Sequence, residues 1–356
     1  MDNTEKLLKR LTEASGVPGF EAEVRALIRG ELEGIATIEQ DRIGSIVCRK
    51  QGTRPSPKVM LAAHMDEIGF MVKQITKEGH LRFVPLGGWW EQVMLAQRVI
   101  VKTARGDVPG ILGAKPPHIL TPDERNKVVD KRDMYIDIGA TSREEAEQAG
   151  VRPGDPVVPV SAFTPLAGGK TYLAKAWDDR VGCALFVQAL QRLASEEHPN
   201  TVYGAGTVQE EVGLRGAKTT AYVVDPDVAI VLESDIAYDV PGMEQEEPPV
   251  ALGKGPSLVV FDAGMIPNTR LRDLTIETAK GLGIPLQFSS LEGGRTDGSV
   301  IHLHNAGVPT IFLGVAARHI HSHTSIIHRD DYDRLLNLLV ALVKRLDGET
   351  VAGLTR

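Results

Sequence analysis

The chain has 356 residues, enough for about two domains of roughly 150 residues each, or for one large α/β domain. Hydrophobic residues make up 42% and charged residues 24%, so composition excludes disordered, collagen-like and coiled-coil chains. Lys and Arg number 40 against 47 Asp and Glu, a net charge of -7 that gives no reason to expect a nucleic-acid partner.

The cysteines and the first residues of the chain bear on its location. Cys48 and Cys183 are too few for a disulfide framework or a zinc ribbon, which favours a reducing compartment. The opening sequence MDNTEKLLKRLTEASG alternates charge with leucine and has no uninterrupted apolar run, so it predicts neither a signal peptide nor a membrane span. We expect a cytoplasmic protein with no membrane partner.

The chain begins with patterns typical of two helices and then two strands. The first helix should stop near residue 16, and the second should run over about 21–32. Two apolar runs follow, over about 43–48 and 58–63. Because these runs are too short for helices and are bounded by turn residues, they predict strands.

The pattern changes twice further along the chain. From about Val72 to Val160, short β-type runs alternate with Gly and Pro, and VRPGDPVVPV has a turn typical of a small barrel or sandwich. After Lys175, helix and strand patterns alternate to the end, which predicts one α/β domain interrupted by a β domain. The expected elements are a helix in VGCALFVQALQRLA, strands in TVYGAGTV, VAIVL and PSLVVFD, a helix over 268–282, a strand in PLQFSS, a helix over 298–306, a strand in PTIFLGV and a helix over 331–346.

Acidic residues and histidines collect directly after the predicted strands, at the edge where open α/β sheets bind ligands. A further acidic pair precedes the helix that begins near Val181. Five such clusters at one edge predict a binding site. They are His64-Met65-Asp66-Glu67, Asp178-Asp179, Gln209-Glu210-Glu211, Glu233-Ser234-Asp235 and Arg318-His319-Ile320-His321-Ser322-His323.

These residue types fit a site for two divalent metal ions. Two ions about 3.5–4 Å apart need a bridging carboxylate and one or two terminal His or carboxylate ligands each. Another carboxylate must stay free to take a proton from water, and the adjacent Glu210 and Glu211 suit that division of labour. Plainer interpretations remain for each cluster: Asp178-Asp179 could cap a helix, and the glutamates and histidines could be surface residues.

Five segments resemble, in order and spacing, the blocks of the tetrahedral (TET) aminopeptidases. This family of cytosolic dinuclear metallopeptidases has members named glutamyl aminopeptidase, FrvX-like protein or, misleadingly, endoglucanase. The resemblance covers nearly the whole chain, including GGWWEQVMLAQRV and GAKPPHIL. The five segments are AAHMDEIGFMV, LAKAWDDRVGCA, GTVQEEVGLRGAK, EGGRTDGSVIHLHNAGVPT and ARHIHSHTSIIHRDDY.

The resemblance implies a fold, an activity and an assembly. The fold is a mixed-sheet α/β/α metallopeptidase domain, residues 1–71 and 163–356, interrupted by a PDZ-like or barrel-like β domain over 72–162 that mediates dimerisation. The activity is hydrolysis of N-terminal residues from peptides with a free N-terminus, with two divalent ions per subunit, Zn or Co first and Mn also possible. The assembly is a homo-oligomer, in which dimers form a tetrahedral dodecamer.

The resemblance also implies a role for each site residue. Glu210 is the general base that activates a metal-bridging water, and Asp66 orients and polarises the His64 imidazole. The family often has a cis peptide bond after the bridging aspartate, here Asp178. The implied metal ligands are His64, Asp178 as the bridge, Glu211, Glu233 and His321, rather than His319 or His323.

One ligand position departs from the common pattern of the family. Many members have Asp where Glu233 stands, directly after the strand that matches VAIVL. The longer side chain can still reach a metal ion, but Asp235, two residues later, remains a rival.

The GGRTDG segment matches the glycine-rich substrate loop of the family, with Arg295 in place of the usual small residue. Asp297 could face the amino group of a substrate, or Thr296 or Asp297 could cap the following helix. We expect the remaining candidate histidines, His118, His302 and His304, to be packing or surface residues.

Two matters stay open from the sequence. Trp89, Trp90 and Met94 in the insert could form an interface, although a buried core is the safer interpretation. Three other functions compete: a glycoside hydrolase, which would leave His64 and His321 unexplained, a related dinuclear deacylase with no need for a free amine, and an inactive metal-binding scaffold.

Overall fold

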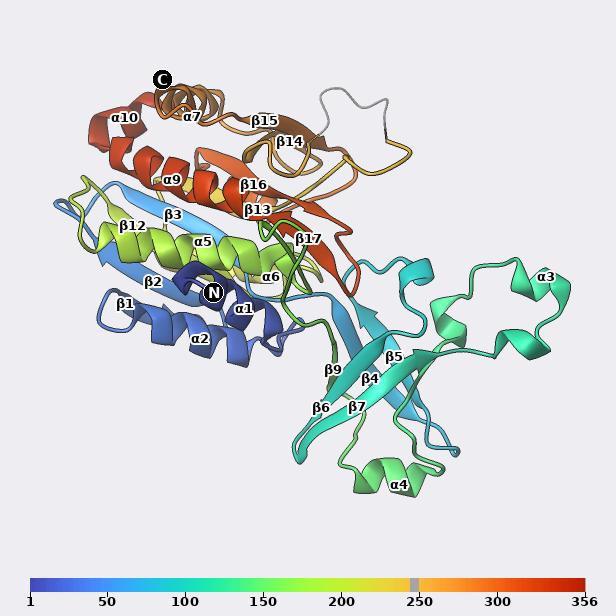
Figure 1. Ribbon diagram of the computed structural model, residues 1–356. Coiled ribbons are helices and arrows are strands. Elements are labelled where there is room, and N and C mark those ends of the chain that lie inside the picture. Colours follow the sequence, from blue (N-terminus) through green and yellow to red (C-terminus); the bar gives the residue numbers. More distant parts are fainter. Residues whose placement is uncertain (244–249, 356) are drawn as a thin grey trace.

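The computed structural model describes residues 1–243 and 250–355, in which a layered α/β domain carries a separate β-barrel (Figure 1). This architecture confirms the predicted fold class, a mixed-sheet α/β domain with a small β-rich insert. None of the described helices is both long and apolar enough to span a membrane.

Four buried strands form the centre of an 11-stranded sheet in the layered domain. Their order is β12, β3, β13, β16, and neighbours in this group run parallel, so their carboxyl ends meet at one edge. Helices cover both faces, which explains why the central strands are continuous apolar runs. The strands of the sheet are β1 (Thr37–Gln40), β2 (Ile46–Gln51), β3 (Lys58–His64), β10 (Thr164–Pro165), β11 (Thr171–Ala174), β12 (Thr201–Thr207), β13 (Val228–Ile236), β14 (Ser257–Asp262), β15 (Gln287–Leu291), β16 (Thr310–Arg318) and β17 (Ser325–His328).

Side chains of the central strands alternate between two apolar cores. Leu61 and Ala63 lie in the larger core, under α1, α2, α5, α7 and α9. Met60 and Ala62 lie in a smaller core with α6 and α8. The helices of this domain are α1 (Asn3–Glu13), α2 (Ala22–Leu32), α5 (Trp177–Leu193), α6 (Arg215–Val224), α7 (Thr269–Gly281), α8 (Gly298–Ile301), α9 (Arg329–Arg345) and α10 (Gly348–Gly353).

The insert is a closed antiparallel barrel with the strand order β4-β5-β8-β7-β6-β9. It has its own apolar core, in which Phe70, Trp89 and Val101 take part. Figure 1 shows the barrel beside the layered domain, with the segment around α3 extending further away. Its elements are β4 (Gly69–Ile75), β5 (Leu81–Leu86), η1 (Glu91–Val93), β6 (Arg98–Thr103), β7 (Gly106–Gly113), η2 (Pro117–Ile119), α3 (Pro122–Arg125), η3 (Lys131–Asp133), β8 (Tyr135–Asp137), α4 (Arg143–Gln148) and β9 (Pro156–Pro159).

Some elements differ from the prediction for identifiable reasons. The helix expected over 298–306 is the short α8, and Asn305, with a φ of 50°, lies in the left-handed region where a helix cannot continue. The strand expected over 43–48 begins only at Ile46, because the Asp41 carboxylate accepts the amides of residues 43–45 and forms a turn.

Candidate metal centre

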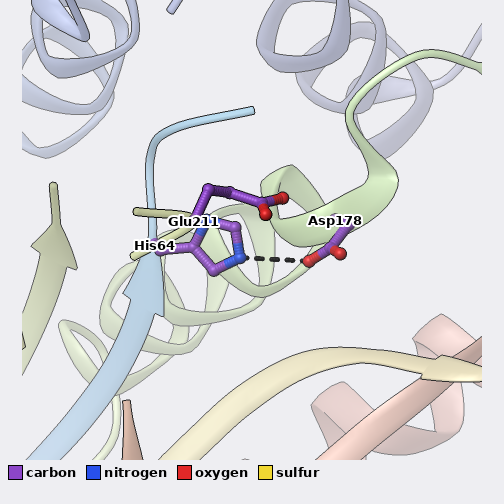
Figure 2. A group of neighbouring side chains, drawn as sticks. All are labelled: His64, Asp178 and Glu211. Atoms are coloured by element: carbon purple, nitrogen blue, oxygen red, sulfur yellow. Dashed lines mark hydrogen bonds and ion pairs between the residues drawn. The ribbon is translucent and has the colours of Figure 1, made fainter. Parts of the chain in front are cut away.

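The carboxyl ends of the central strands bring the predicted clusters together. His64 is the last residue of β3, Glu233 lies in β13, and the loops after β12 and β16 carry Glu211 and His321. Asp178 joins them from the start of α5. Figure 2 shows His64, Asp178 and Glu211 with their polar ends pointing toward one another. The sheet topology therefore converts clusters that are distant in sequence into one group.

Asp178 lies between two imidazoles and presents a different oxygen to each. Its Oδ1 is 3.0 Å from His64 Nε2, and its Oδ2 is 3.3 Å from His321 Nε2. Glu233 Oε2 lies 3.6 Å from His64 Nε2, and Glu211 Oε2 lies 3.7 Å from His321 Nε2. The group thus has two halves that share one carboxylate, which is the arrangement that a bridging ligand requires.

Asp179 has a different role from its neighbour. The peptide bond between Asp178 and Asp179 is cis, as the resemblance led us to expect. The fully buried Asp179 accepts the backbone amide of His64 at 3.1 Å and that of Gly182 at 2.9 Å. It lies near His64 and Glu233, but both of its oxygens are bonded to backbone amides. The acidic pair therefore combines both interpretations of its sequence, a helix cap in Asp179 and a site residue in Asp178.

Asp66 contacts both sides of the centre. Its backbone carbonyl lies 2.9 Å from His64 Nδ1, whereas its carboxylate is 3.7 Å from the same atom. The carboxylate instead accepts the backbone amides of Glu210 at 3.0 Å and Glu211 at 3.1 Å. Asp66 thus orients the imidazole through its main chain and positions the two glutamates through its side chain.

Burial and neighbouring charges shift the pKa values of the residues in the cluster. Burial raises the pKa values of Glu210 and Glu233 well above the usual value of a glutamate. Burial, together with the charge of Asp178, also raises the pKa of Glu211 to about 8. Burial lowers the pKa of His321, but Asp178 and Glu211 outweigh this effect and raise it to about 9. Glu211 Oε1 is buried and has no hydrogen-bond partner among the described residues. Carboxylates and imidazoles crowded in this way fit divalent metal ions.

A cavity of about 1060 Å³ opens beside the cluster. Glu210 lines it, with the Glu210 Oε2 atom 4.0 Å from His64 Nε2. The glycine-rich segment borders the same cavity through Gly293, Gly294 and Arg295. The space is large enough for a peptide end, and the Glu210 carboxylate belongs to its lining.

Other candidate residues lie outside this group. The Asp297 carboxylate is buried against Thr207, and it neither lines the cavity nor caps α8 with its side chain. His302 bonds to the Gly298 carbonyl and His304 faces Asp225. The Asp235 carboxylate accepts the Ser289 hydroxyl at 2.6 Å. The exposed His118, on η2, lines none of the cavity around the centre.

The three aromatic and apolar candidates of the insert divide between core and surface. Trp89 and Met94 are buried, whereas Trp90 is 60% exposed. The safer interpretation of the sequence, a core position, therefore holds for Trp89 and Met94.

Three features of the site had no signal in the sequence. The Gly88 carbonyl, from the barrel, lies 2.7 Å from His321 Nδ1. The Glu21 carboxylate, at the start of α2, accepts the amide of Gln209. Glu67, part of the first cluster, forms a buried pair with Lys175. Each of these contacts joins residues more than 100 positions apart, so local patterns could not reveal it.

Comparison with known proteins gives one consistent result. A family model described as M42 glutamyl aminopeptidase matches residues 44–338, and a model described as AMPT matches residues 2–27. The putative aminopeptidase FrvX of Escherichia coli is 41% identical over 97% of this chain and 96% of its own. The glutamyl aminopeptidase of Lactococcus lactis is 36% identical over 97% of each chain.

Solved structures agree with the sequence relatives. A TET aminopeptidase from a marine sediment archaeon of the Thaumarchaeota is 50% identical, with a TM-score of 0.97 over 99% of this chain and 100% of its own. The TET1 peptidase of Pyrococcus horikoshii is 33% identical, with a TM-score of 0.86 over 97% of this chain and 100% of its own. That peptidase can assemble into a tetrahedron or a large octahedral shell.

Proposed function

The chain belongs to the M42 glutamyl aminopeptidase family and is a hydrolytic aminopeptidase, and from this premise we propose that it removes N-terminal residues from peptides with a dinuclear metal centre. The family implies divalent metal ions. Their number, two per subunit, and their identity, Zn or Co with Mn as a third possibility, are part of the proposal.

Five side chains would hold the ions. His64 and Glu233 belong to one half of the cluster, Glu211 and His321 belong to the other, and Asp178 joins the halves. When bound, the ions supply a water of lowered pKa and a positive charge that polarises the scissile carbonyl group. The observation that carries the proposal is that each Asp178 oxygen faces a different imidazole.

Glu210 supplies the proton transfers. It lines the cavity, it is buried, and its backbone amide is fixed by Asp66, so its carboxylate is aimed at the space beside His64. From there it takes a proton from the attacking water and passes it to the leaving amine. Burial raises its pKa above the usual value, which favours a carboxyl group that must act as an acid as well as a base.

The experiment that tests this proposal is Glu210→Gln. The amide keeps the size of the side chain but cannot accept the proton, so turnover of aminoacyl chromogenic substrates should fall by about 10²–10⁴-fold while both ions per subunit remain bound. Glu277→Gln, an exposed glutamate on α7, is the matched control and should behave as the wild type. Near-normal turnover in Glu210→Gln would refute the role of Glu210.

The substrate range separates the remaining alternatives. An aminopeptidase needs a free N-terminal amine, so a peptide with an acetylated N-terminus should not be cleaved. Equal cleavage of blocked and free peptides would instead favour a deacylase. No turnover of any peptide by the fully metal-loaded protein would favour an inactive scaffold.

We also infer the assembly and the location of the chain. A homo-oligomer, with dimers that form a tetrahedral dodecamer, is supported by the TET relative that assembles into closed shells. The barrel strands, from Gly69 to Pro159, support an inserted assembly domain over 72–162 within a catalytic domain of 1–71 and 163–356. The two cysteines are free and buried, which supports a reducing, cytoplasmic location.

A further inference from the structure

The barrel reaches into the metal centre through one short segment. Gly87, Gly88 and Trp89 follow β5, and Gly88 lines the central cavity together with Asp178 and His321. We propose that this segment completes the metal centre, because it fixes the tautomer and the orientation of His321. The inference rests on the proposed function, since it assigns His321 to one of the two ions.

The first step concerns the imidazole itself. The Gly88 carbonyl lies 2.7 Å from His321 Nδ1, and a carbonyl can only accept, so Nδ1 carries the proton. Nε2 is then the ring nitrogen left to bind a metal ion, and it faces Asp178 Oδ2 at 3.3 Å. Partners of this kind on the second ring nitrogen orient metal-binding histidines in general.

The second step compares the two histidines of the centre. His64 ends a central strand, and its Nδ1 is held by the Asp66 carbonyl two residues away. His321 lies in an irregular loop between β16 and β17 with a φ of 58°, so no regular element fixes its ring. Its Nδ1 is held from the barrel. The same type of contact is thus local for one half of the centre and is supplied by the insert for the other.

The third step is the need for glycine in the segment. A Cβ atom at Gly88 would lie 3.0 Å from His321 Nδ1, and one at Gly87 would lie 3.0 Å from Glu211 Oε2 and 2.5 Å from Ile68 Cγ2. Gly87 also has a φ of +88°, a backbone conformation that residues other than glycine rarely adopt. Both positions therefore allow the backbone to approach two proposed ligands of the same ion.

The fourth step is the anchor. Trp89 is 6% exposed, donates from Nε1 to the Gly69 carbonyl at 3.0 Å, and stacks on Phe70 with ring centroids 4.7 Å apart. Its ring also lies 4.9 Å from that of His323, in the same loop as His321. Gly88 and Trp89 are thus positioning residues, and Trp89 fixes the segment to both the barrel core and the histidine loop.

The test is metal binding by the full-length chain after Gly88→Ala. Chelated protein is titrated with Zn²⁺ or Co²⁺ alone, and ions per subunit and both dissociation constants are measured. One ion should bind as in the wild type and the second about 10–100-fold more weakly, which is the effect expected when such a partner is disturbed. Gly30→Ala on α2, where a Cβ atom meets nothing within 4 Å, is the matched control and should bind both ions normally.

A double variant separates this role from a general structural one. His321→Ala should weaken the same ion, and Gly88→Ala combined with His321→Ala should be no weaker than His321→Ala alone, because Gly88 acts through His321. Normal binding of both ions by Gly88→Ala, equal weakening of both, or an additive loss in the double variant would each overturn the inference.

Two further points keep the test decisive. Trp89→Phe keeps the aromatic stack but removes the Nε1–H bond to Gly69, so it should weaken the same ion to a smaller extent even if Gly88→Ala does not fold. No change in the affinity of that ion in Trp89→Phe would contradict the anchor. A wild type that binds fewer than two ions would refute the proposed function itself, whereas failure of the inference alone leaves the wild type with both.

Discussion

Glu233 and Asp235 lie two residues apart on β13 but have different surroundings. Glu233 lines the central cavity, and its Oε2 is 3.6 Å from His64 Nε2. The Asp235 carboxylate instead accepts hydrogen bonds from the Ser289 hydroxyl and from the backbone amide of Ile236. The longer glutamate side chain reaches the centre, whereas the aspartate stabilises the contact between β13 and β15.

Alanine substitutions should separate these two carboxylates. Glu233→Ala removes a proposed ligand, so the purified protein should retain about one ion per subunit instead of two. Asp235→Ala should retain both ions but lower the free energy of unfolding by about 1–3 kcal/mol, because it leaves the Ser289 hydroxyl without its acceptor. Metal analysis and thermal unfolding of both variants check this. Metal content that survives without Glu233 and collapses without Asp235 would reverse the assignment.

The sequence identifies site residues where their signal is local. Asp178, Glu211 and His321 could be found because each stands in a cluster next to a predicted element, and parallel strands bring such clusters to one edge. Gly88 could not be found, because its contribution is a backbone carbonyl, which every residue has. Its contact with His321 crosses 233 positions of the chain and depends on how the barrel is placed.

Elements, like residues, are held in place by contacts that local sequence patterns do not predict. Glu21, the residue that precedes α2, is 2% exposed and accepts the amides of Gly19 at 2.7 Å and Gln209 at 3.2 Å, both with Oε1. Asp66 accepts the next two amides, those of Glu210 and Glu211. Two buried carboxylates therefore hold three consecutive amides of the loop that carries the proposed base.

Glu21 should make stability depend on pH in a predictable direction. Burial and the nearby charge of Asp66 raise its pKa from 4.5 to about 7. A raised carboxyl pKa stabilises the fold below pH 4.5, and this contribution is lost as the pH rises through 7. Gln keeps one carbonyl oxygen for both amides and cannot ionise. Glu21→Gln should therefore match the wild type near pH 4.5 and exceed its stability by about 3 kcal/mol above pH 7.

Thermal unfolding of chelated protein across this pH range measures the effect of Glu21→Gln. Glu33→Gln, at an exposed glutamate at the other end of α2, is the matched control. A difference between Glu21→Gln and the wild type that does not grow with pH would show that folding does not raise the pKa of Glu21.

The limits of elements were harder to predict than their existence. The helix after Asp297 ends at Ile301 because the chain turns back, with the His302 carbonyl accepting the amide of Val308. The strand β1 was not expected, because TIEQ is mostly exposed and has no apolar pattern. Such features are set by tertiary contacts, which override local preference.

At the scale of the whole molecule, the insert has two sides with different consequences. Its inner side supplies Gly88 to the metal centre and packs Trp89 between the barrel core and the histidine loop. The next residue, Trp90, is 60% exposed, in contrast to the buried Trp89. The alternation of β and α/β patterns predicted an interrupted domain, but it could not show that the interruption forms part of the site.

An exposed tryptophan of this size predicts a contact with another subunit, because large aromatic side chains are enriched in interfaces. Light scattering of the full chain should give the mass of a closed homo-oligomer, and Trp90→Glu should lower that mass, since it places a charge in an apolar contact. Leu303→Glu, at a 70% exposed apolar residue of the layered domain, should leave the dimer contact through the barrel intact. A wild-type protein that is only monomeric would refute the assembly. Equal masses for Trp90→Glu and the wild type would show that the contact between subunits does not include this part of the barrel.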